Sequence, residues 1–300
     1  MLKTLKPFVL DKIHQPQANV SRIGGGFYAD VYRFDFEDQT TQIIKVYKSH
    51  GIMMKEVKQI QLLSEYALFP MPEVLWTHSA DDSFSSDILA MNHLQGENGG
   101  NAFYLNPSKR RNLAEQVIDN LLAFHNIHNP DGFAEIDSDT YYKTFNEYYK
   151  EKAYDILSMA KKLKENGQIT DYILDVVNEA AEKFDEIFYI PITESSLIHG
   201  DYNMWNIMID KKHCKVTAVI DPCGCMWADS EYDLYQLNNA NGKHLKLLET
   251  YAKKKQLSEN YRQKMAFYEL FTEIEHYHNS GYPVIQKLIK KQADNLKQYL

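Results

Sequence analysis

Cysteine is scarce in this sequence, with three residues in 300: Cys214, Cys223 and Cys225. An odd number of cysteines, in a chain that starts with no apolar signal segment, argues against a disulfide framework. A zinc site would need about four ligands at recognisable spacings, and no His or Cys pair completes one with Cys223 and Cys225. We therefore interpret these two residues as reduced cysteines in a turn.

Long apolar runs and an excess of basic residues are also absent. No stretch approaches the ~18–20 apolar residues that a membrane-spanning helix requires, and residues 1–7 lack the apolar core of a signal peptide. The 41 acidic residues outnumber the 33 basic ones, and the formal charge of −8 differs from the basic footprint of nucleic-acid-binding proteins. These absences predict a cytoplasmic protein without membrane or nucleic-acid partners.

The first 95 residues have the pattern of a β-sheet that carries one helix. Short apolar or alternating segments are separated by turn-forming residues, which is typical of strands. One longer segment has apolar residues at helical spacing and ends before Pro70 and Pro72. The expected strands are residues 20–23, 31–36, 41–47, 74–77 and 87–94, and the expected helix is residues 52–68.

The pattern changes after the glycine-rich segment 96–100. Long amphipathic segments follow, interrupted by one short β-rich segment at 197–218. The expected helices are residues 108–126, 141–166 and 169–188, with further helices from about residue 229 onward. We therefore predict an α+β protein with two lobes, a small antiparallel β-lobe (1–95) and a larger, mainly helical lobe (96–300), joined by a hinge at 96–100.

One segment of the second lobe combines the residue types that phosphoryl transfer needs. Asp201 is followed five residues later by Asn206, and after fifteen more residues by Asp221. Transfer of a γ-phosphoryl group requires a group that orients the attacking hydroxyl and oxygen ligands that hold Mg²⁺ on the phosphates. We interpret Asp201 as the catalytic residue, and Asn206 and Asp221 as Mg²⁺ ligands. The same residues would also fit a polar loop and a turn before Pro222.

A glycine-rich turn near the N-terminus fits the same chemistry. Gly24, Gly25 and Gly26 lie between two expected strands, with Ala29 three residues further on. Glycines at such a turn allow backbone N–H groups to approach the phosphates of ATP without a Cβ in the way. A plain hairpin would explain the glycines equally well.

Lys45 lies within an apolar strand fourteen residues after Val31. In kinase chemistry such a lysine pairs with the α- and β-phosphates and with a glutamate on the next helix. Glu56 shares a helical face with Ile60, and a carboxylate on a buried face needs a cation. Glu65 is the alternative partner and lies off that face. Glycine turn, Lys, Glu and the Asp/Asn/Asp set therefore occur in the order that a kinase requires.

These motifs resemble the aminoglycoside phosphotransferase superfamily and, within it, the fructosamine kinase branch. Residues 199–201 read His-Gly-Asp where protein kinases have His-Arg-Asp, and residues 220–222 read Ile-Asp-Pro where they have Asp-Phe-Gly. Residues 227–234 are similar to the helix-opening Gly-Asp-x-Glu-x-Asp-Leu of the same group. The catalytic loop departs from the usual His-Gly-Asp-Leu-Trp-x-Gly-Asn, because Trp205 is displaced and takes the place of the glycine before Asn206.

The resemblance implies a two-lobed protein-kinase-like fold and an ATP- and Mg²⁺-dependent kinase of a small hydroxylated molecule, such as a sugar amine or an aminoglycoside. It also implies that Met91 is the gatekeeper between the lobes and that the backbone of Asn92 and Leu94 holds adenine. His199 is expected to pack beneath the catalytic loop, and Asp233 to brace that loop by hydrogen bonds. The oligomeric state is left open.

Two other function classes compete with a small-molecule kinase. A protein Ser/Thr kinase would need a peptide platform, but only eleven residues separate Asp221 from Asp233, too few for an activation loop. A catalytically inactive, nucleotide-binding scaffold would typically lack the Lys, Asp or Asn group. Lys45, Asp201 and Asn206 are all present.

Overall fold

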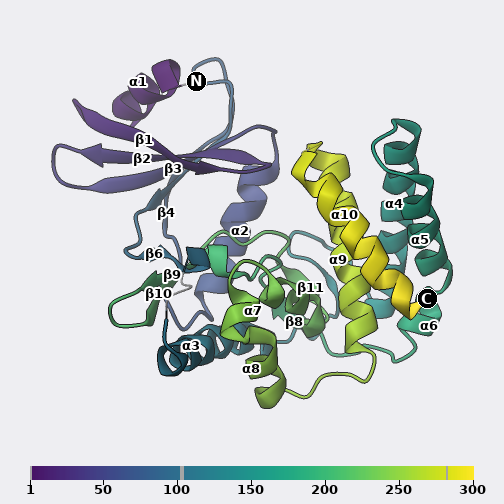
Figure 1. The fold of residues 1–300 in the computed structure, drawn as a ribbon. Helices are drawn as coiled ribbons and strands as arrows, with labels where there is room; N and C mark the ends of the chain where they lie inside the picture. The colour runs from purple at the N-terminus through teal and green to yellow at the C-terminus, as the bar shows by residue number, and fades with distance from the viewer. Residues whose placement is uncertain (1, 102–104, 282) are drawn as a thin grey trace.

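The N-terminal part of the chain forms a five-stranded antiparallel sheet in the order β1-β2-β3-β5-β4. The computed structural model describes residues 2–101, 105–281 and 283–300 (Figure 1). The strands are β1 (Ala18–Gly25), β2 (Ala29–Phe36), β3 (Thr41–Tyr47), β4 (Val74–His78) and β5 (Ile88–Asn92). All five overlap the segments that the sequence predicts as strands.

One helix covers each face of this sheet. Helix α2 (Ile52–Ser64) packs Met53, Val57 and Ile60 against one face. Helix α1 (Leu2–Lys12) packs Leu5 and Val9 against the other. The sequence did not predict α1, because it contains Pro7 and buries only two side chains, which leaves a weak helical pattern.

Strand register decides which face Lys45 occupies. β3 lies between β2 and β5, and Lys45 pairs with Val31 on one side and Leu89 on the other. Residues directly opposite one another on neighbouring strands point to the same face of a sheet. Leu89 belongs to the apolar cluster beneath α2, so Lys45 points toward the helix that carries Glu56.

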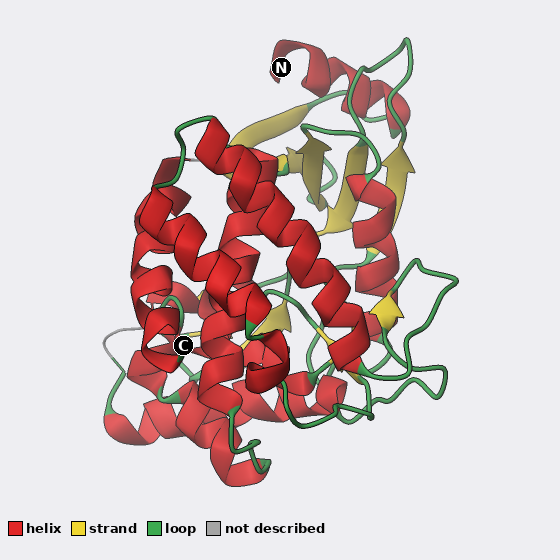
Figure 2. Cartoon of the chain, turned by 90° about the vertical axis from the view of Figure 1, so that its right-hand side faces the viewer, coloured by secondary structure: helices red, strands yellow, loops and turns green. Residues whose placement is uncertain are grey.

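Helices dominate the second lobe, and several of them lie side by side in Figure 2. Phe145 and Tyr149 of one helix and Phe267 and Phe271 of another are fully buried in the largest apolar cluster. The helices are α3 (Pro107–His125), α4 (Phe145–Glu165), α5 (Asp171–Glu182), α6 (Phe184–Ile187), α7 (Gly242–Leu245), α8 (Leu247–Lys254), α9 (Tyr261–Ser280) and α10 (Pro283–Leu296).

Three of the expected helices differ in their ends. α2 ends at Ser64 rather than 68, because the N–H groups of Glu65 and Tyr66 turn back to carbonyls three residues earlier and the N–H of Leu68 donates to Asn120 Oδ1. α4 begins at Phe145 rather than 141, because Thr144 and Glu147 form a capping box that defines the first turn. The helix expected at 169–188 is divided into α5 and α6 at Lys183. Within the described ranges, the structure has no helix of the length and apolarity that crossing a bilayer requires.

Two small sheets hold the loops that join these helices. β6 (Glu97–Asn98) pairs with β9 (Ile207–Asp210), which pairs with β10 (Lys215–Val219). β11 (Met226–Ala228) lies between β7 (Ala134–Glu135) and β8 (Ser196–Ile198). Since β6 already pairs with the second lobe, the chain leaves the first sheet between residues 92 and 97. A lobe boundary at 95/96 remains our prediction.

Candidate active site

Lys45, Glu56 and Asp221 form a charged group between the two lobes. Lys45 Nζ donates to Glu56 Oε1 at 2.5 Å and also to Asp221 Oδ1. Burial alone would lower the pKa of Lys45, but Asp221 and Glu56 outweigh burial and raise it. The predicted pairing of Lys45 with Glu56, rather than Glu65, is therefore present, and Asp221 joins it from 176 residues away in the sequence.

A tyrosine that the sequence analysis missed completes this group. Tyr47 Oη donates to Glu56 Oε2 at 2.6 Å, so both carboxylate oxygens of Glu56 are bonded. Tyr47 follows Lys45 by two residues on β3 and therefore points to the same face. That alternation was the only signal that could have indicated its role.

Asp201 is held by two amide side chains of its own loop. Asn203 Nδ2 donates to Asp201 Oδ1 at 2.6 Å, and Asn206 Nδ2 donates to Asp201 Oδ2 at 2.8 Å. Burial and the nearby Asp221 charge raise the pKa of Asp201 to about 8, against the opposite effect of the two amides. The carboxylate therefore lies in a desolvated position with a defined orientation.

Asp233 braces the start of this loop, as predicted. Its two carboxylate oxygens accept the backbone N–H groups of His199 and Gly200 at 2.9 and 2.8 Å. Gly200 has φ +84°, and a Cβ there would lie 2.1 Å from the carbonyl oxygen of Cys223. Only glycine therefore permits the close approach of the catalytic loop to the segment after Asp221.

His199 packs beneath the loop in its neutral form. Its Nδ1 accepts the backbone N–H of Asp201 at 3.3 Å, and its ring lies near Phe124 and Tyr202. Burial lowers the pKa of His199 to about 4. This arrangement fits a structural histidine rather than a proton carrier.

Each residue predicted as a Mg²⁺ ligand keeps one side-chain oxygen that accepts no hydrogen bond from the residues that the structure describes. The side-chain Nδ2 of Asn206 donates to Asp201, so its Oδ1 points away from Asp201. The backbone carbonyl of Asn206 accepts the backbone N–H of Ile220, next to Asp221. Asp221 has a left-handed φ of 59°, a strained conformation that clusters at functional sites. One amide and one carboxylate oxygen fit Mg²⁺, which takes its other ligands from water and phosphate.

The glycine-rich turn closes one side of this region. Gly26 N–H donates to the carbonyl of Ala29 at 3.0 Å. Gly25 has φ +150°, and a Cβ there would lie 2.8 Å from side-chain atoms of Arg22 and Asp30. A Cβ at Gly26 would meet no atom within 4 Å among the described residues. The turn thus leaves open space beside the Cα of Gly26, whose carbonyl accepts Lys48 Nζ at 2.6 Å, while Gly24 and Gly25 end β1.

The predicted adenine-binding residues lie at the end of β5 (Met91 and Asn92) and two residues after it (Leu94). Met91 is buried and pairs with Ile43 on β3, and Ile43 precedes Lys45 by two residues. Asn92 is bonded to the residue before β4, because its N–H donates to the carbonyl of Glu73 and its side chain accepts the N–H of Glu73. Within the described part of the chain, the backbone of Leu94 makes no hydrogen bond, which leaves it available to a ligand.

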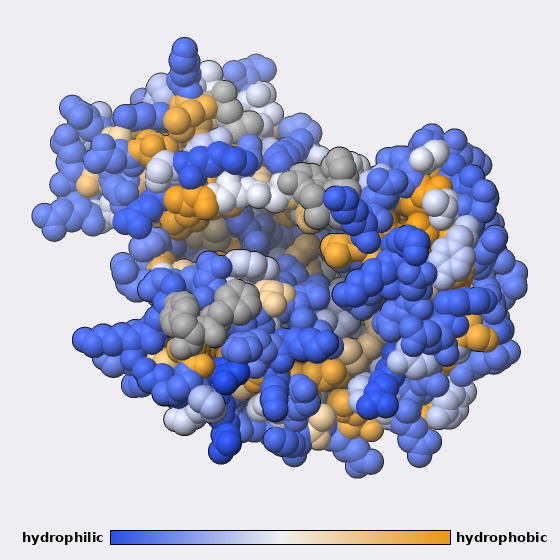
Figure 3. Space-filling model, viewed as in Figure 1, coloured by the Kyte–Doolittle hydropathy of each residue, from blue (hydrophilic) through white to orange (hydrophobic). Residues whose placement is uncertain are grey.

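A hollow separates the lobes on the side shown in Figure 3. In the second lobe, residues of α4, α9 and β7 line an open cavity of about 260 Å³, at which Glu151 and Asp155 are exposed. Glu135 of this cavity bonds Lys55 of α2 at 2.6 Å and Tyr148 at 2.9 Å, and Lys152 lies 3.3 Å from Glu275. The sequence analysis missed this set, because its members come from elements far apart in the chain. The lining residues are Glu135, Tyr142, Tyr148, Glu151, Lys152, Asp155, Ile156, Met159 and Glu275.

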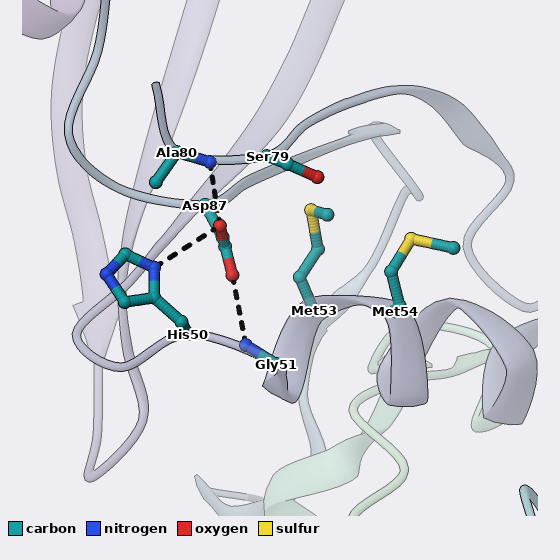
Figure 4. Close-up of a pocket in the computed structure, with 7 residues that line it drawn as sticks. All are labelled: His50, Gly51, Met53, Met54, Ser79, Ala80 and Asp87. Atoms are coloured by element: carbon teal, nitrogen blue, oxygen red, sulfur yellow. Dashed lines mark hydrogen bonds and ion pairs between the residues drawn. The ribbon is translucent and has the colours of Figure 1, made fainter. Parts of the chain in front are cut away.

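A second cavity, of about 450 Å³, lies at the start of α2 (Figure 4). Asp87, a carboxylate of its lining, accepts the N–H groups of Gly51 and Ala80 and lies 3.6 Å from His50. These bonds join the loop before α2 to the loop before β5. No residue of the Lys45–Asp221 group lines this cavity.

The chain is similar to known phosphotransferases in sequence and in fold. Residues 19–268 match the sequence model of the phosphotransferase enzyme family. A proposed fructosamine-3-kinase of Thermobifida fusca has 20% identity and a TM-score of 0.69, over 98% of each chain. Aminoglycoside 2′-phosphotransferase-IIIa, solved with GDP, has 13% identity and a TM-score of 0.69, over 98% of this chain and 96% of the other.

A curated relative is similar at the sequence level. The uncharacterized protein YcbJ of Escherichia coli (strain K12) is 20% identical over 220 residues, which are 73% of each protein. The solved structures share the two-lobed, kinase-like fold that the sequence predicts. The family match covers most of the chain. The protein therefore belongs to the phosphotransferase enzyme family.

Proposed function

We propose that the protein transfers the γ-phosphate of ATP to a hydroxyl of a small molecule. The observation that carries this proposal is the convergence of Lys45, Glu56 and Asp221 beside Asp201 and Asn206, from both lobes. Related structures have been solved with GDP or ADP, which supports a nucleotide site between the lobes.

In this mechanism Lys45 contacts the α- and β-phosphates, with Glu56 and Tyr47 holding its position. Asn206 and Asp221 would hold Mg²⁺, which neutralises charge on the phosphates when it is bound. Asp201 orients the acceptor hydroxyl and accepts its proton. The new bond joins the acceptor oxygen to the γ-phosphorus, the bond to the β,γ-bridging oxygen breaks, and ADP leaves.

The acceptor we propose is a polyhydroxylated compound, with sugar amines and aminoglycosides as the first class to test. One related structure contains kanamycin and another gentamicin. The cavity between α4 and α9 supports this choice, because it is lined by four carboxylates, Glu135, Glu151, Asp155 and Glu275, and one lysine, Lys152. Excess negative charge favours acceptors that carry an ammonium group.

Two alternatives have less support. The segment between Asp221 and Asp233 contains only β11 and the start of the 3₁₀ helix η3 (Ser230–Asn238), which offers no peptide platform. An inactive scaffold would not require the intact group around Asp201.

The test is an ATP-consumption screen of the purified protein with ketosamines, aminoglycosides and free sugars, run beside D201N as the matched inactive control. Acceptor-dependent ADP formation by the wild type, absent in D201N, supports the proposal. ATP binding without turnover of any acceptor class would favour the scaffold alternative.

A further inference from the structure

Asn203 connects the catalytic loop to the carboxylate of Asp201. Its Nδ2 donates to Asp201 Oδ1 at 2.6 Å, and its Oδ1 accepts the backbone N–H of Trp205 at 2.9 Å. The side chain is therefore bonded at both ends of its amide. Asn203 is only 8% exposed, so water competes little for either bond.

The second amide on Asp201 has a different set of partners. Asn206 Nδ2 donates to Asp201 Oδ2 and to the Asp201 carbonyl, both at 2.8 Å. The two amides therefore have different roles. Asn203 Oδ1 accepts the N–H of Trp205, whereas Asn206 Oδ1 accepts no hydrogen bond from a described residue and is available to a metal ion.

We infer that Asn203 is a positioning residue that fixes the rotation of the Asp201 carboxylate toward the acceptor hydroxyl. An aspartate carboxylate has a broad χ2 preference, so a bond to one oxygen alone leaves it free to tilt about that bond. A donor on each oxygen removes this freedom and still leaves lone pairs for the hydroxyl. Because a small misplacement of a reacting group lowers rates strongly, the second donor matters for turnover. The inference rests on the proposed kinase function.

Three variants test this role. N203S keeps an oxygen that can accept the Trp205 N–H, as serine does at helix N-termini, but lacks the amide donor. N203D is nearly isosteric and keeps the same acceptor, but it places a second carboxylate beside Asp201. N203A removes both contacts.

A positioning role predicts a specific kinetic pattern. N203S should lower kcat by about 10–100-fold, in the range of one well-placed polar contact, while KM for ATP and for the acceptor stays within about threefold. N203D should be slower than N203S, because the carboxylate repels Asp201. In a D201A background, N203S should leave the residual rate nearly unchanged, since Asn203 acts through Asp201.

Other kinetic outcomes would overturn the inference. A kcat of N203S close to that of the wild type would mean that Asn206 positions Asp201 without help. A raised KM for ATP, together with an equal loss in the D201A background, would mean that Asn203 contacts the phosphoryl group directly.

A measurement without turnover separates this inference from the proposed function. In a ¹H–¹⁵N spectrum, the side-chain amide signal of Asn203 is identified by its absence in N203D, which keeps the size of the native side chain. D201A should move that signal, whether or not any acceptor is phosphorylated. An Asn203 amide signal at the same position in the wild type and D201A would refute the contact.

Discussion

At the scale of single residues, the site depends on a few polar atoms with assigned partners. Both carboxylate oxygens accept hydrogen bonds in each of Asp201, Glu56 and Asp233. Because each of these carboxylates is desolvated, the loss of one partner leaves a polar atom without compensation. Conservative substitutions of these carboxylates or of their partners should therefore change activity or stability by measurable amounts.

Replacing Asp201 by asparagine should abolish phosphoryl transfer and leave nucleotide binding intact. Asparagine keeps the size of the side chain but cannot accept the hydroxyl proton, so we expect kcat to fall by roughly 10²–10⁴-fold. Steady-state rates and calorimetric ATP affinity provide the measurement. Turnover within a few-fold of the wild type would contradict the assignment of Asp201.

Asn206→Ala and Asp221→Ala should weaken the use of Mg²⁺ with ATP. Each removes one oxygen that is placed for the ion, and D221A also removes a partner of Lys45, so it should be the more severe. Rates measured across a Mg²⁺ titration should show a shift of the half-saturating concentration to higher values. If the Mg²⁺ dependence of both variants matches the wild type, the ion binds elsewhere.

At the scale of elements, β3 and α2 act together. β3 presents Lys45 and Tyr47 on one face, and α2 places Glu56 against both. Removing Lys45 leaves Glu56 with one partner, while removing Glu56 leaves Lys45 paired to Asp221. The strand and the helix are therefore coupled through these contacts.

This coupling predicts non-additive kinetics. The double variant K45A/E56A should lose little more kcat/KM than K45A alone, because Glu56 acts through Lys45. A double-mutant cycle measures the interaction, with E65A as a control on the same helical region. Strictly additive losses would show that Lys45 and Glu56 do not cooperate in the reaction.

Helix α9 carries a carboxyl group whose ionisation opposes folding. Burial, followed by the charge of Glu269, raises the pKa of Glu273 to about 7. The unfolded-state pKa of a glutamate is about 4.3. The folded pKa is thus the higher one, so stability falls as the pH rises from roughly 4 to 7 and stays lower above that.

Glu273→Gln should therefore raise the melting temperature at pH 8 by about 1–4 °C and have little effect near pH 4. Thermal unfolding at the two pH values provides the comparison. E275Q is a suitable control on the same helix, because Glu275 lies 3.3 Å from Lys152 and its loss removes an ion pair. An equal gain for E273Q at both pH values would show that its effect is not due to ionisation.

At the scale of the whole molecule, several contacts join the lobes. Lys45 with Asp221, and Lys55 with Glu135, connect the first lobe to the second. The ring of Phe27, in the glycine-rich turn, stacks on His276 of α9 with centroids 6.2 Å apart. A nucleotide between the lobes would add contacts to both.

Nucleotide binding should consequently stabilise the folded protein as a unit. A non-hydrolysable ATP analogue with Mg²⁺, at one hundred times its Kd, should add about 2.7 kcal/mol to the free energy of unfolding. A thermal-shift titration measures this, and D221A should respond less at the same Mg²⁺ concentration. No shift with any nucleotide would remove the basis for a nucleotide site.

The sequence alone determined the local features of this protein. Strand and helix periodicity indicated the five-stranded sheet, α2 and α3, because the apolar pattern of each segment reflects one buried face. The order of glycine turn, Lys45, Glu56, Asp201, Asn206 and Asp221 indicated phosphoryl transfer, since each residue type has one role in that chemistry. Glu56 was chosen over Glu65 on the same periodicity.

Only the tertiary structure decided which distant residues meet. The contacts of Lys45 with Asp221, of Lys55 with Glu135 and of Asp233 with the catalytic loop span from 33 to 176 residues of sequence. Tyr47 and Asn203 gained their roles from side-chain hydrogen bonds, and alternation along β3 indicates only the face to which Tyr47 points. Periodicity reports which face of an element is buried, but packing determines what that face touches, and the site is formed by those contacts.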